Sequence, residues 1–171
     1  ARTVMGRTMM RTAIRLMLIL ALAVPCAWAD YTEVDWVELM PEEDLEAIKN
    51  MPMPSHESDQ AVTLPEEVLA GRVVPGFDGR EVRIRGFVVP LTHDEDQRVT
   101  EFFLVPYYGA CIHVPPPPPN QIIHVQYPEG FRLDTQQIPF GIEGTLRVHY
   151  VSNDVAEASY VMEADSVNFY Q

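Results

Sequence analysis

Five consecutive prolines, residues 115–119, constrain the fold of this 171-residue chain more than any other feature. Proline has no backbone N–H and holds φ at about −65°, so the run cannot be a paired central strand. It is expected to be a polyproline II rod about 15 Å long, at about 3.1 Å per residue. Such a rod either packs on its own chain, where Tyr107 and Tyr108 are candidate contacts, or docks into an aromatic groove of a partner.

On both sides of the prolines, apolar and polar residues alternate with the period of two that is typical of strands. The pattern predicts strands over residues 81–91, 99–105, 122–126, 138–151 and 158–170. Gly86, Gly141 and Gly144 mark bends or bulges in the first and fourth of these strands. Five short strands, two of them coiled, predict a mainly β fold that is a small OB-like β-barrel.

Residues 30–71 are expected to form an acidic N-terminal arm with short helices, ahead of a barrel domain at 72–171 that holds the polyproline loop. Pro41 opens the first helix, with acidic residues in its first turn and Lys49 in its last, which suits the helix dipole. A capping signal over residues 63–66 and Gly71 delimit a second helix.

Residues 1–29 are expected to be a secretory signal peptide. Four arginines precede an apolar run over residues 16–24, and Ala27 and Ala29 are small residues that suit signal peptidase. The apolar run is too short for a permanent membrane span, so the processed protein is not expected to be an integral membrane protein. Cleavage before Asp30 predicts a periplasmic protein. A lipoprotein anchored at Cys26 is disfavoured, because Pro25 stands where that route needs a small residue.

The chain carries a formal charge of −13. Removing residues 1–29 takes away four of the 12 basic residues and no acidic one, so eight face 25 acidic residues and the charge becomes −17. Such a chain repels phosphate backbones, so no nucleic acid is expected among its partners. Cations or basic partners suit it better.

Cleavage would leave Cys111 as the last cysteine, in an oxidising compartment where no internal disulfide can form. Cys111 and His113 point to the same side of an extended backbone, and His124 follows near the start of the next strand. A thiolate with imidazoles suits Zn or Cu, so these three residues are the candidate metal ligands. The alternative is that Cys111 simply packs in a core, as cysteine often does.

No motif of the common enzyme classes is present, and the chain is predicted not to be an enzyme. A Cys111 nucleophile with His113 or His124 as its base would need a third, orienting residue, and the sequence suggests none. The acidic stretch at residues 93–96 is expected to be a solvated hairpin tip, because it lacks the glycine and the spacing of a calcium loop.

Three segments, residues 78–91, 101–121 and 144–146, resemble the bacterial exported family catalogued as domain of unknown function 3299. The resemblance covers roughly residues 75–170 and implies export and the barrel fold, but the family has no settled activity. Two positions depart from its pattern: Arg85 stands where proline is expected, and Tyr108 where phenylalanine is usual.

Two functions remain open from the sequence. One is an exported, non-enzymatic envelope protein that binds Zn or Cu as an accessory to a membrane transport or assembly system. The other is a protein–protein interaction module in which Cys111 is only structural.

The signal-peptide hypothesis predicts that the exported protein begins at Asp30, because signal peptidase cleaves after small residues. N-terminal sequencing of protein recovered from the cell envelope measures this directly. A blocked N-terminus at a lipidated Cys26 would show that the cleavage site is wrong.

Overall fold

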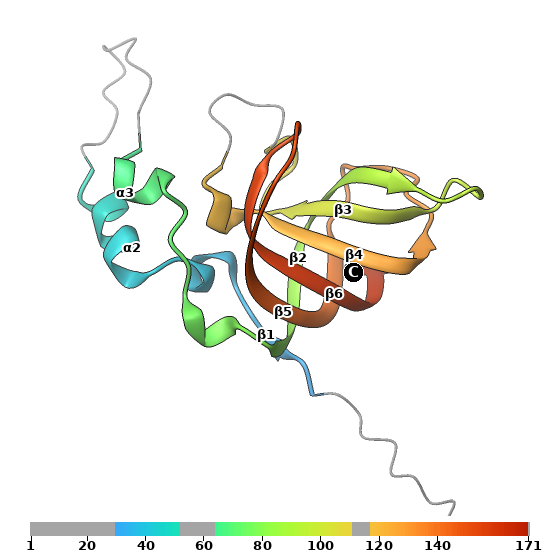
Figure 1. Cartoon of the computed structure of the whole chain (residues 1–171), viewed down its shortest axis with the longest axis horizontal. Helices are drawn as coiled ribbons and strands as arrows, with labels where there is room; N and C mark the ends of the chain where they lie inside the picture. Colours follow the sequence, from blue (N-terminus) through green and yellow to red (C-terminus); the bar gives the residue numbers. More distant parts are fainter. Residues whose placement is uncertain (1–29, 52–63, 111–116, 171) are drawn as a thin grey trace, which may run out of the picture.

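The computed structural model describes residues 30–51, 64–110 and 117–170 (Figure 1). It is mainly β, and every strand expected from the sequence is present. The elements are β1 (Thr32–Glu33), η1 (Trp36–Leu39), α2 (Glu42–Lys49), α3 (Glu66–Leu69), η2 (Pro75–Phe77), β2 (Arg80–His93), β3 (Val99–Val105), η3 (Pro119–Gln121), β4 (Ile123–Phe131), β5 (Phe140–Ser152) and β6 (Glu157–Phe169).

The strands β2 to β6 close into a five-stranded barrel. Their order is β2-β3-β4-β6-β5, and β5 pairs back with β2. Within the barrel β4 and β6 run parallel, and the other neighbours run antiparallel. The long strand β2 makes this closure possible, because residues 80–86 pair with β5 and residues 87–93 with β3. The predicted OB-like β-barrel is therefore confirmed.

Two glycines lie where neighbouring strands approach too closely for a side chain. A Cβ on Gly86, where β2 changes partner, would lie 2.7 Å from the carbonyl oxygen of Val105. A Cβ on Gly144 would overlap the carbonyl oxygen of Glu163 and lie 2.8 Å from the Cα of Ala164. The pairing of β5 with β6 shifts register between Glu143 and Gly144, where β6 has one extra residue, so Gly144 lies opposite a bulge in β6.

Alternation along the strands divides the apolar residues between two faces. The inner set fills the barrel and includes the fully buried Phe102, Leu104, Ile123, Tyr160 and Met162. The outer set covers the opposite face of β3 and the segments beside it, and it consists of Phe103, Val105, Ala110, Ile122 and Ala158. We call this second set the outer cluster.

The N-terminal arm lies along one side of the barrel (Figure 1). Its strand β1 pairs in parallel with β2, and Val34 and Leu39 are buried with the barrel interior. The hydroxyl of the fully buried Tyr160 donates to the carbonyl of Leu39 at 2.9 Å and accepts from the N–H of Val74 at 2.8 Å. Burial raises the pKa of this hydroxyl, which keeps it protonated as a donor.

The two helices of the arm begin after prolines, as expected. Pro41 precedes α2 and Pro65 precedes α3, while the Thr63 of the predicted capping signal lies outside the described residues. The fully buried Asp44 of α2 forms an ion pair with Arg72, and the carbonyl of Arg72 accepts a hydrogen bond from Asn120 at 2.7 Å. These contacts connect α2 to the start of the barrel domain and to η3.

The described part of the proline run is Pro117–Pro119. The sequence predicts a rod that extends to Pro119, but the rod ends at Pro118. Pro118 has the polyproline II angles φ −57° and ψ 152°, but Pro119 begins the 3-10 turn η3. Proline permits both, because its fixed φ also suits the first position of a helical turn. Pro119 packs against Gly71, so this end of the run contacts its own chain.

The helices within the described ranges are all too short or too polar to cross a membrane.

Replacing Gly144 by alanine is expected to lower the free energy of unfolding by about 1–3 kcal/mol, because the new methyl group meets strand backbone that cannot move aside. Gly76→Ala is the matched control, since a Cβ at Gly76 meets no atom within 4 Å, and it should change stability by less than about 0.5 kcal/mol. Urea unfolding followed by circular dichroism measures both. Equal stability of the two variants would contradict the close approach.

Tyr160→Phe is expected to cost about 1–3 kcal/mol, because it leaves the carbonyl of Leu39 and the N–H of Val74 without their buried partner. Tyr127→Phe serves as the control, since the hydroxyl of Tyr127 bonds to Glu129 at an exposed position. The same urea titration reads out both variants. A loss for Tyr127→Phe as large as that for Tyr160→Phe would contradict this role of the buried hydroxyl.

Candidate functional site

The outer face of β3 and β4 carries the one predicted metal ligand that the described residues include, His124. In the strand register His124 lies opposite Phe103, and the two rings make an edge-on contact with centroids 5.6 Å apart. His124 follows Ile122 by two residues and therefore shares its side of the chain, outside the barrel. The side chain is almost fully buried there, with His124 only 6% exposed.

A carboxylate fixes the orientation of the His124 ring. Nε2 of His124 lies 2.7 Å from Oε1 of Glu101, and the other carboxylate oxygen accepts a hydrogen bond from the hydroxyl of Thr92 at 2.7 Å. A carboxylate only accepts, so Nε2 carries the hydrogen, and in the neutral ring Nδ1 is the nitrogen with the lone pair. This carboxylate–histidine arrangement is the one that orients histidines which ligate metals.

A tight turn leads from β3 toward the predicted ligands. The N–H of Ala110 donates to the carbonyl of Tyr107 at 3.3 Å, and Gly109 has φ 81°, as the third residue of a type II turn requires. Ala110 is fully buried in the outer cluster. Cys111 and His113 follow directly and lie outside the described residues.

The three predicted ligands are therefore described in part only. Within residues 30–51, 64–110 and 117–170, no three His, Cys, Asp or Glu side chains are grouped so that they could hold a metal. That search does not include Cys111 and His113, so the ligand set of Cys111, His113 and His124 stays a prediction.

The acidic hairpin tip between β2 and β3 uses its first carboxylate internally. Oδ1 of Asp94 accepts hydrogen bonds from the N–H groups of Asp96 and Arg98, at 2.9 and 2.8 Å, and Oδ2 pairs with the Arg98 guanidinium. The backbone N–H of Arg98, more than its side chain, lowers the pKa of Asp94. This carboxylate stabilises the turn.

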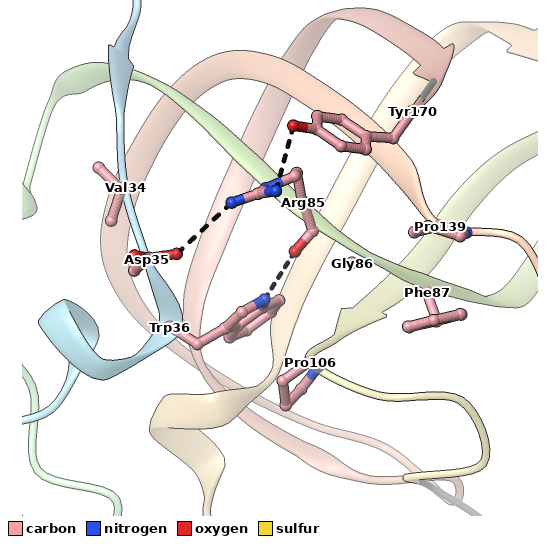
Figure 2. Close-up of a pocket in the computed structure, with 9 residues that line it drawn as sticks. All are labelled: Val34, Asp35, Trp36, Arg85, Gly86, Phe87, Pro106, Pro139 and Tyr170. Atoms are coloured by element: carbon pink, nitrogen blue, oxygen red, sulfur yellow. Dashed lines mark hydrogen bonds and ion pairs between the residues drawn. The ribbon is translucent and has the colours of Figure 1, made fainter.

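A second candidate site has no counterpart in the sequence analysis. It is a pocket of about 370 Å³ between the arm, β2 and the end of β6, with Trp36, Arg85, Phe87 and Tyr170 among its walls (Figure 2). The indole N–H of Trp36 donates to the carbonyl of Arg85 at 2.6 Å. The Arg85 guanidinium stacks on the ring of Tyr170, 4.7 Å from its centroid, and donates to its hydroxyl at 3.1 Å.

A third hollow, of about 280 Å³, adjoins the prolines. Its walls are mostly apolar and come from α3, the proline run and the turn between β5 and β6: Leu69, Pro117, Pro118, Pro119, Ile122, Val155, Ala156 and Glu157. Ile122 also belongs to the outer cluster, so this groove continues the face that carries His124.

Comparison with known proteins adds family membership and fold. The family model described as "Protein of unknown function (DUF3299)" matches residues 36–169. A crystal structure of a DUF3299 family protein from Pseudomonas aeruginosa PAO1 is 37% identical in sequence, with 82% of this chain and 97% of that chain covered and a TM-score of 0.64. No curated protein matches the sequence.

Proposed function

Because the chain belongs to the DUF3299 family, whose function is unknown, we propose a function from the site itself: an exported, non-enzymatic protein that binds Zn or Cu through Cys111, His113 and His124. The observation that carries the proposal is the His124–Glu101 pair. The ring is nearly buried, its Nε2 is occupied by a carboxylate at 2.7 Å, and its Nδ1 is left as the coordinating atom.

The chain connection supports Cys111 as the second ligand. Cys111 is bonded to Ala110, and adjacent Cα atoms are about 3.8 Å apart. Ala110 is buried in the outer cluster together with Phe103, whose ring contacts His124. This connection favours Cys111 as a ligand beside His124.

The chemistry of the ligands supports the choice of metal. A thiolate and imidazoles favour Zn or Cu over Mg or Ca, which prefer oxygen ligands. The strongly acidic chain also attracts cations from solution. With no recognisable catalytic motif, such a protein would hold or deliver the metal as an accessory to a membrane transport or assembly system.

The apolar groove beside the prolines favours a second candidate function, a protein–protein interaction module. Leu69 and Val155 at this groove are 41% and 51% exposed, so the groove offers apolar surface that a partner could bury. In this alternative Cys111 packs in the outer cluster and binds nothing.

The metal proposal predicts that protein purified after expression of the full chain, then dialysed against Zn or Cu, retains about one metal ion per chain. Cys111→Ser, His113→Ala and His124→Ala should each abolish retention, because each removes a ligand. Glu101→Gln should weaken binding about 10–100-fold, because it disturbs the group that orients His124. Elemental analysis and competition with a chelator measure the two effects.

His149→Ala is the matched control, since His149 is an exposed histidine on β5, and it should leave metal retention unchanged. Wild-type protein that retains no metal, or a His124→Ala variant that retains as much as wild type, would refute the site. If Cys111→Ser leaves metal content unchanged but lowers stability by about 1 kcal/mol or more, Cys111 is a packing residue and the interaction module is favoured.

A further inference from the structure

We propose that the pocket of Trp36, Arg85 and Tyr170 binds a neutral saccharide. This goes beyond the proposed metal function and involves different residues. The pocket of about 370 Å³ lies within the range of small-molecule sites, about 300–1,000 Å³. Figure 2 shows that its walls come from the arm, from β2 and from the C-terminal end of the described chain.

The walls offer flat apolar surfaces. Trp36 and Phe87 are half-buried, and Tyr170 is 42% exposed, so parts of the rings can be reached from solution. The C–H face of a sugar ring packs on such aromatic faces, which combine an apolar body with few polar atoms. A pocket built mainly from rings, with a few polar groups between them, therefore suits a cyclic ligand.

Two carboxylates form long ion pairs with the Arg85 guanidinium without hydrogen-bonding to it: Asp35 lines the pocket, and Glu33 lies outside its lining. Nε of Arg85 lies 3.7 Å from Oε1 of Glu33, and Nη2 lies 4.0 Å from Oδ1 of Asp35. Both separations exceed a hydrogen bond, which spans about 2.7–3.2 Å. The Arg85 guanidinium carries five N–H donors. Among the described residues, it makes one hydrogen bond, from Nη1 to the hydroxyl of Tyr170.

These gaps select the chemistry of the ligand. A hydroxyl beside each gap can accept from the guanidinium and donate to the carboxylate at the same time. An anion would face Glu33 and Asp35, a cation would face Arg85, and a hydrocarbon would remove water from all three charges without replacing its hydrogen bonds. A neutral ligand rich in hydroxyl groups satisfies every one of these groups.

A neighbouring hollow extends the site. It has a volume of about 240 Å³, shares Tyr170 with the first pocket, and is otherwise lined by Arg83, Gly141, Glu143, Asn168 and Phe169. Tyr170 is thus a wall of both spaces. The arrangement favours an oligosaccharide over a single sugar.

Tryptophan fluorescence provides a direct test. The full chain has two tryptophans, so a Trp28→Phe variant leaves Trp36 in the pocket as the single emitter. Titration with maltotriose, cellotriose or N,N′,N″-triacetylchitotriose should change its emission saturably for at least one of them, with a dissociation constant below about 10 mM. Trigalacturonate and triglucosamine, the charged probes, should bind at least about tenfold more weakly.

Variants in the same background locate the binding. Tyr170→Ala and Arg85→Met should each weaken it about tenfold or more, because they remove a stacking surface and a charged donor. Arg147→Met, at an exposed arginine of β5 that does not line the pocket, is the matched control and should bind as before. Unchanged circular dichroism excludes unfolding as the cause.

Three results would overturn the proposal: no response to any of the three neutral trisaccharides, tighter binding of a charged trimer, or undiminished binding by Tyr170→Ala. His124→Ala separates this proposal from the metal function, since it should abolish metal retention and leave saccharide binding unchanged.

Discussion

The buried hydroxyl of Tyr160 holds the N-terminal arm on the barrel, and much of the surface depends on that attachment. It joins the carbonyl of Leu39 to the N–H of Val74, two backbone groups that water would otherwise have to satisfy. With Leu39 seated in the core, the preceding residues Asp35 and Trp36 are fixed beside β2. The aromatic pocket exists because the arm is held there, whereas the pair of His124 and Glu101 is built from barrel strands alone.

A small barrel filled by its own side chains leaves function to its outer faces. Phe102, Leu104, Tyr160 and Met162 occupy the interior and are fully buried. The two candidate sites therefore lie on the outer face of β3 and β4 and at the seam where the arm meets β2. The two places differ in kind: the first presents a buried, oriented imidazole, and the second presents opposed charges between aromatic rings.

The barrel could be predicted from the sequence because its information is local. Period-two patterns mark the strands, and Gly86 and Gly144 stand where neighbouring strands approach closely, so both the strands and these glycines could be found within short windows. The partners of the arm could not be predicted, because Leu39 and Tyr160 are 121 residues apart and β1 has only two residues. His124 was a predicted ligand, but its pairing with Glu101 depends on the register of β3 and β4. The residues of the aromatic pocket come from segments far apart in the chain, and Arg85 stood out only as a departure from the family pattern.

The N-terminal arm is synthesised before the strands that it contacts. Its strand β1 pairs with β2, and Leu39 contacts Tyr160 of β6. The arm is made first, yet its partners in β2 and β6 are made later, and β6 is the last strand of the chain. Contacts between such distant residues form slowly, because a long loop must close before they contribute. Leu39 therefore meets Tyr160 only after the final strand has been synthesised, and until then its apolar side chain is open to contact with other chains.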